Sequence, residues 1–178
     1  MRALATGSDH AGGVTAGLAA LANLPDIRWH MIGHLQTNKA KDALETFDII
    51  ETLDSERLAN ALARIRPSPP VPVLIEVNLG GETSKTGVAP ERVGPLIDAV
   101  RARVEVLGLM TIPPPAANPA AMRPYFARLR ELRDRLAATT GLALSELSMG
   151  MTEDFEVAIE EGATIVRIGR AVFGERTQ

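Results

Sequence analysis

Short apolar runs alternate with longer amphipathic stretches along the 178-residue chain. The runs are rich in Val, Ile and Leu and contain little polar alternation, as is typical of strands whose two faces are both covered. Six strands are predicted on this basis, at Arg28–Leu35, Asp48–Leu53, Val71–Leu79, Val104–Ile112, Leu147–Met151 and Thr164–Ile168.

The stretches between these runs carry apolar residues at helical spacing. In Ser55–Arg66, for example, Leu58 and Leu62 share one face behind a serine that can cap the helix. Strands that alternate with helices indicate βαβ units and a parallel sheet. The pattern fits either an open doubly wound sheet or most of a (β/α)₈ barrel, and it does not decide between them. The other predicted helices are Pro90–Arg101, Tyr125–Thr139, Asp154–Glu161 and a modest one at Val14–Leu24.

The first residues differ from the rest of the chain. Residues 1–13, MRALATGSDHAGG, are small, glycine-rich and weakly apolar. We expect an irregular N-terminal arm here, either flexible or the remnant of a longer N-terminus, followed by a single domain over residues 14–178.

Composition narrows the class of protein. A hydrophobic content of 46% and a net charge of −3 argue against disorder and against a nucleic-acid surface. The absence of cysteine excludes disulfides, thiolate metal sites and a cysteine nucleophile. No apolar run approaches the roughly 20 residues of a membrane span, and no signal peptide opens the chain. We therefore expect a cytoplasmic protein that binds neither membrane nor nucleic acid.

Two histidines four residues apart, His30 and His34, raise the question of a metal site. On a helix they would share a face, but Arg28–Leu35 has no cap and no helical apolar stripe. On a strand they would lie about 13 Å apart, too far to hold one ion. No metal site is therefore predicted.

Two strand–helix junctions near the end of the chain suit an anion. Ser148–Asp154 passes from a strand through small residues, and its Thr152 can cap the next helix. Arg167 lies in an apolar strand, where a cation needs an acceptor or an anion, and Gly169 behind it allows close approach of a ligand. Phosphate sites in barrels frequently use the last two such loops. The alternative for the first junction is an ordinary strand–helix turn, and the alternative for Arg167 is a salt-bridged or snorkelling side chain.

Two other polar stretches are weaker candidates. His34 follows the first predicted strand at the end where ligands bind, although a packing role is the more common one for such a residue. The loop Gly80–Gly87 contains Gly, Ser, Thr and Lys85, but the phosphate-loop spacing G-x-x-x-x-G-K-[ST] is absent. A phosphate-binding loop of that type is excluded.

Several motifs together resemble one family. They are WHMIGHLQTNKAK, VNLGGETSKTGV, LGLMTIPPP, the RPYFARLREL helix and SMGMTEDFEVAIEEGATIVRIGRAVFG, which occur in this order from about residue 14 to residue 175. The chain resembles the pyridoxal phosphate homeostasis proteins, whose fold is a barrel like the N-terminal domain of alanine racemase. The resemblance implies an incomplete (β/α)₈ TIM-barrel type, with about six of its eight β/α units present.

The resemblance also implies a cofactor, pyridoxal 5′-phosphate, and roles for particular residues. Arg167 would face the pyridine nitrogen and keep it unprotonated, which suits a carrier or a mild racemase better than a transaminase. His34 is assigned to the same site. The residues that would meet the phosphate are Gly150, Met151, Thr152, Gly169 and Arg170.

The family binds its cofactor through a lysine on a strand near the N-terminus. None of the three lysines here, Lys39, Lys41 and Lys85, fits a buried strand position. We therefore expect non-covalent or impaired binding and a role in vitamin B6 homeostasis rather than catalysis. The alternatives are an amino-acid racemase, for which Tyr125 is the only tyrosine available as a second base, and a non-catalytic truncated paralogue acting through a partner. Self-association would cover the open barrel edges.

Overall fold

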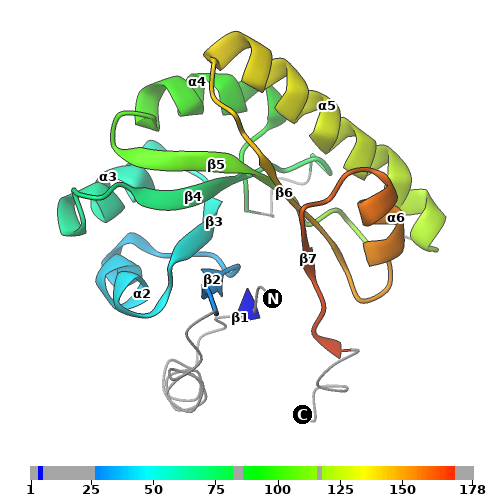
Figure 1. Ribbon diagram of the computed structural model, residues 1–178, viewed down its shortest axis with the longest axis horizontal. Coiled ribbons are helices and arrows are strands. Elements are labelled where there is room, and N and C mark those ends of the chain that lie inside the picture. The colour runs from blue at the N-terminus through cyan, green and yellow to red at the C-terminus, as the bar shows by residue number, and fades with distance from the viewer. Residues whose placement is uncertain (1–3, 6–26, 82–85, 116–117, 171–178) are drawn as a thin grey trace.

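A computed structural model of the protein describes residues 4–5, 27–81, 86–115 and 118–170. Its strands form one parallel sheet in which spatial order follows chain order from β1 to β7. The sheet curls into an arch with the helices on its outer side, and the edge strands β1 and β7 lie at the open side (Figure 1). The strands are β1 (Leu4–Ala5), β2 (His30–Met31), β3 (Ile49–Leu53), β4 (Val71–Glu76), β5 (Val104–Met110), β6 (Glu146–Met151) and β7 (Ile165–Arg167).

The helices connect successive strands, as a parallel sheet requires. Ser55 caps α3, because its hydroxyl accepts from the Leu58 amide at 3.4 Å. The α5 helix ends at Gly141, whose φ of 71° is the left-handed conformation that glycine adopts readily. The helical segments are η1 (Thr37–Lys39), α2 (Ala40–Thr46), α3 (Glu56–Ile65), α4 (Pro90–Val100), η2 (Pro119–Met122), α5 (Arg123–Thr140) and α6 (Phe155–Glu160).

The barrel-type α/β fold expected from the sequence is confirmed, with differences at the N-terminal side. The predicted strand Arg28–Leu35 shrinks to His30–Met31, and most of its residues lie in irregular chain. Leu4–Ala5 pairs with these two residues and adds a strand that the sequence did not predict, inside the segment expected to be irregular. A strand of two residues is too short to show a periodic apolar pattern in the sequence, and it is recognised only by its pairing with β2. The predicted helix Val14–Leu24 lies outside the described residues.

The core has two parts, one on each face of the sheet. The larger part packs the outer face against the helices and includes Val73 and Ile75 of β4. Leu74, which alternates with them, packs with Met110 and Ile165 in a separate small cluster. Because side chains alternate along a strand, this cluster lies on the inner face of the arch. Among the described residues, no helix is both long and apolar enough to cross a membrane.

Candidate functional site

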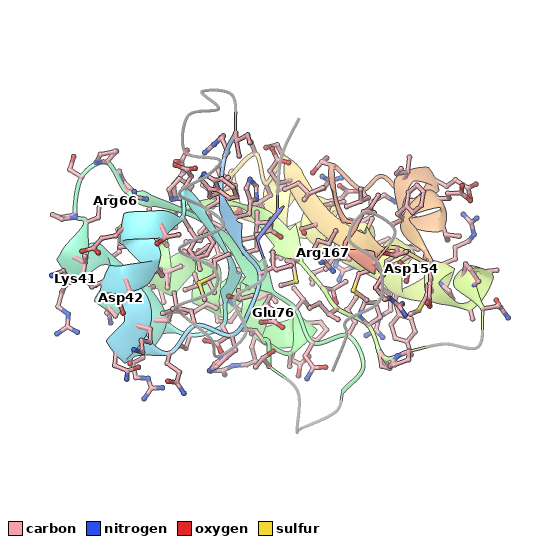
Figure 2. All side chains as sticks on the ribbon, turned by 90° about the horizontal axis from the view of Figure 1, so that it is seen from below. Lys41, Asp42, Arg66, Glu76, Asp154 and Arg167 are labelled. Atoms are coloured by element: carbon pink, nitrogen blue, oxygen red, sulfur yellow. The ribbon has the colours of Figure 1, made fainter. Side chains whose placement is uncertain are left out.

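The inner face of the sheet becomes polar toward the carboxyl ends of the strands. Glu76 and Arg167 follow Leu74 and Ile165 by two residues on β4 and β7, so each pair shares the inner face. In parallel α/β folds this end of the sheet binds ligands. Viewed from the open side of the arch, Glu76 and Arg167 lie near the middle of the molecule (Figure 2). The buried polar residues that come from the strands are His30, Glu51, Thr52, Glu76, Ser148 and Arg167.

Arg167 is held by two of its three guanidinium nitrogens. Its Nη1 donates to the Ser148 hydroxyl at 2.7 Å, and its Nη2 donates to the Thr111 carbonyl at 2.8 Å. Its Nε is buried and has no hydrogen-bond partner among the described residues. Burial lowers the pKa of Arg167, and the nearby Glu51 carboxylate opposes that effect. Two of the five guanidinium N–H groups are thus engaged, and Nε is the nitrogen that is buried without a described partner.

Glu51 connects the two sides of the arch. One of its carboxylate oxygens lies 2.6 Å from His30 Nδ1, and the other accepts from the Ser148 hydroxyl at 2.5 Å. All three side chains are fully buried. A continuous chain of hydrogen bonds therefore runs from β2 through β3 and β6 to Arg167 on β7.

Glu76 is a second buried charge, at the carboxyl end of β4. Its Oε1 accepts from the Thr86 hydroxyl at 2.7 Å, whereas its Oε2 is buried without a described partner. Burial raises the pKa of the Glu76 carboxyl, and the hydrogen bond from Thr86 partly opposes this. Asp54, His34 and Arg167 all lie within electrostatic reach of it. Glu76 therefore interacts electrostatically with residues at the ends of β2, β3 and β7.

The junction after β6 is shaped by Gly150. Its φ is +88°, and an added Cβ would lie 2.5 Å from the Ala158 Cβ, so no other residue fits without a shift. The Met151 amide donates to Asp154 Oδ1 at 2.6 Å and is not free for a phosphate. The expected cap is wrong: the N-cap of α6 is Asp154, not Thr152. Thr152 is half-buried at the turn, and its contact with a cofactor stays a prediction, as does that of Met151.

The junction after β7 lies beside the one after β6, because Met151 pairs with Arg167. Gly169 is exposed, and none of the described residues lies within 4 Å of a Cβ placed on it. Arg170 Nη2 donates to Glu153 Oε1 at 2.5 Å, which links the two junctions at the surface. The structure therefore brings together the residues that the sequence assigned to one anion site.

His34 lies apart from these junctions, after the end of β2. Its side chain is half exposed, and its Nδ1 is 3.6 Å from Asp54 Oδ2. A cavity of about 320 Å³ lies beside it, lined also by Ser55, Arg57 and Thr86. Direct contact of His34 with the cofactor stays a prediction.

The two histidines face different carboxylates, Glu51 for His30 and Asp54 for His34. In the described part of the chain, no group of three acidic or histidine side chains is placed to hold a metal ion. The lysines that can be placed, Lys39 and Lys41, are 61% and 74% exposed near or on α2. Lys41 lies at the periphery, away from Arg167 (Figure 2). Lys85 lies outside the described residues.

Several inner polar residues were not singled out from the sequence. Glu51 and Glu76 carry the same signal as Arg167, a charge inside an apolar strand, and could have been found by it. Ser148 and Thr111 carry no such signal, because small hydroxyl residues are common at strand ends. Their role emerges only from which strands the fold brings together.

Fold and site together define a barrel-type α/β domain with a buried polar cluster, the candidate ligand site, toward the carboxyl ends of its strands. Residues 2–177 match the family model described as "Alanine racemase, N-terminal domain". The pyridoxal phosphate homeostasis protein of Aquifex aeolicus is 52% identical over 155 residues, which span 85% of this chain and 68% of that protein. That of Pseudomonas aeruginosa is 46% identical over 162 residues, spanning 89% of this chain and 68% of its own length. This chain therefore belongs to the alanine racemase N-terminal domain family and, within it, to the pyridoxal phosphate homeostasis proteins.

Solved structures agree with this assignment. PipY of Synechococcus elongatus, solved without pyridoxal phosphate, is 36% identical and superimposes with a TM-score of 0.81 over 90% of this chain and 77% of its own. The structure of PipY with pyridoxal phosphate bound gives a TM-score of 0.80 over 90% and 76% of the two chains.

Proposed function

We propose that this protein binds pyridoxal 5′-phosphate reversibly and serves vitamin B6 homeostasis as a carrier. The observation that carries the proposal is the pairing of two features at the ends of β6 and β7. One is the space left by the described residues around Gly169, and the other is the Nε of Arg167, two residues earlier, which is buried without a described partner. The first suits a phosphate and the second suits an aromatic nitrogen acceptor.

In this proposal the two ends of the ligand are held by different residues. The Thr152 and Gly169 turns would bind the phosphate, with Arg170 as a nearby cation. Arg167 would donate to the ring nitrogen through Nε, the guanidinium nitrogen that has no described hydrogen-bond partner. Pyridoxal phosphate supplies an aldehyde that reacts with amines and a ring that can stabilise charge. An arginine at the ring nitrogen keeps it an acceptor, which limits that stabilisation and favours carriage over catalysis.

The racemase alternative needs a second base at the ring. Tyr125, the one tyrosine in the sequence, packs against the outer core between sheet and helices. It is therefore on the wrong face to serve this site. A cytoplasmic location and association through the open edges remain parts of the proposal.

Gly169→Asp tests where the phosphate binds. The position is exposed and spacious, so the change should leave the fold intact, yet it places a carboxylate against the phosphate. We expect calorimetry to show affinity for pyridoxal phosphate more than about tenfold weaker, since like charges 4 Å apart near a surface repel by up to about 4 kcal/mol.

Asn60→Asp on the exposed side of α3 is the matched control, because it adds the same charge away from the site. Its affinity should equal that of the unaltered protein. Equal affinity in Gly169→Asp would show that the phosphate binds elsewhere.

A further inference from the structure

The contact between Glu51 and Ser148 crosses the interior of the arch. The two residues are 97 positions apart in the chain, and β4 and β5 lie between their strands in the sheet. A bond of 2.5 Å between them therefore cannot run along the sheet from neighbour to neighbour. It spans the concave side, where a ligand would also lie.

The chemistry of the serine hydroxyl gives this contact a direction. A hydroxyl has one proton to donate, and a carboxylate can only accept. The Ser148 proton must therefore point to Glu51, which leaves the oxygen's lone pairs for Arg167 Nη1 at 2.7 Å. His30 lies 2.6 Å from the other Glu51 oxygen and restrains that carboxylate in turn.

The result is a guanidinium with a single permitted orientation. Ser148 fixes Nη1 and the Thr111 carbonyl fixes Nη2, so the position of Nε follows from the planarity of the group. That Nε is buried without a described partner, and a buried unsatisfied donor is costly unless something accepts from it. The hydrogen bonds to Ser148 and Thr111 thus fix the direction of the Nε–H, and none of the described residues accepts a hydrogen bond from it.

We propose that Glu51 and Ser148 are positioning residues that set the orientation of Arg167 toward the ring of the bound ligand. This inference rests on the proposed function, and it concerns recognition of the ring rather than of the phosphate. Glu51 supplies the buried counter-charge, and Ser148 joins it to Arg167; the hydrogen bonds described for these two side chains go to His30, Arg167 and each other. Glu51 and Ser148 therefore determine how strongly the site prefers pyridoxal phosphate to inorganic phosphate.

The test compares two probes, pyridoxal phosphate and inorganic phosphate, on Ser148→Ala. Without the hydroxyl, Arg167 loses one of the two acceptors that restrain it, and Glu51 loses the hydrogen bond that it accepts from Ser148. We expect affinity for pyridoxal phosphate to fall about tenfold, as for one misdirected charge-assisted hydrogen bond, while affinity for inorganic phosphate stays unchanged. Ser148→Thr retains the hydroxyl and should retain the unaltered ratio of the two affinities.

Glu51→Gln is the second variant, because it keeps the shape of the side chain and removes its charge. It should also weaken the binding of pyridoxal phosphate and leave the affinity for inorganic phosphate unchanged. An unchanged ratio of affinities in both variants, or an equal loss for both probes, would overturn the positioning role. If the unaltered protein binds no pyridoxal phosphate at all, the proposed function itself fails, which is a separate outcome.

Discussion

Buried charges on the inner face of the sheet distinguish this protein's interior from an ordinary apolar barrel core. Arg167 and Glu51 compensate each other through Ser148, so both charges retain partners after burial. Glu76 is different, because only one of its carboxylate oxygens has a described hydrogen bond.

Glu76→Gln should change how stability depends on pH. Burial raises the pKa of Glu76, so the folded state holds its proton more tightly than the unfolded chain does. Its contribution to stability is present at acid pH and is lost as the pH rises through the folded pKa. Glutamine cannot ionise and avoids that loss. We expect the variant to have the higher free energy of unfolding at pH 8 in urea titrations.

The difference between Glu76→Gln and the unaltered protein should close at acid pH, where the glutamate is protonated in both states. A Gln variant that is less stable at pH 8 would indicate that the charged carboxylate is favourable, through Arg167. Glu105→Gln, at an exposed position on β5, is the control for removing a glutamate outside the buried site.

Two acidic residues, Glu160 and Glu161, join the end of α6 to α5. Glu161, just after α6, accepts from Arg123 Nη1 at 2.7 Å and from Arg130 Nη1 at 2.5 Å. Both arginines come from α5. Glu161 therefore ties the end of α6 to α5, shortly before β7 begins.

Glu161→Gln should destabilise the protein at neutral pH. The hydrogen bond from Arg123 lowers the pKa of Glu161, and Arg130 adds to that effect. The stabilisation is therefore present above the unfolded pKa and is lost as the pH falls through the folded one. Thermal unfolding should show a lower Tm than the unaltered protein at pH 7 and a smaller difference near pH 3.

Glu160→Gln is a suitable comparison, because Glu160 also pairs with Arg123 but is 60% exposed. Its effect on Tm should be smaller, as for exposed ion pairs generally. Equal effects of the two changes would mean that burial of Glu161 adds nothing to the junction.

The elements themselves were largely predictable from the sequence. Alternation of apolar runs with helical stripes is a local signal, and it located β3 to β7 and the helices α3 to α6. The two-residue strand β1 was missed, because its pairing with β2 depends on the fold rather than on its own residues. Arg167 was found from a charge in an apolar strand. Its partners Ser148 and Thr111 could not be found, because only the curl of the sheet brings them to it.

At the scale of the whole molecule, the sheet is an arch and not a closed barrel. In the part of the chain that the structure describes, β1 and β7 each pair on one side only. Unpaired strand edges are sites for association with another chain. The open side therefore suits a second copy of the protein.

We expect light scattering after size-exclusion chromatography to give a mass above that of one chain, rising with protein concentration. Saturating pyridoxal phosphate serves as a second condition, because it tests whether the ligand alters the association. A mass of one chain across the whole concentration range would rule out association through the edges.

Reversible binding of pyridoxal phosphate without a covalent bond is the central claim, and one titration tests it most directly. The intact 178-residue chain is titrated with pyridoxal phosphate by calorimetry, alone and in excess inorganic phosphate. The saturated sample is then treated with borohydride and weighed by mass spectrometry. We expect saturable binding that phosphate weakens, and an unmodified mass. Absence of saturable binding, or a stoichiometric adduct on Lys39, Lys41 or Lys85, would contradict it.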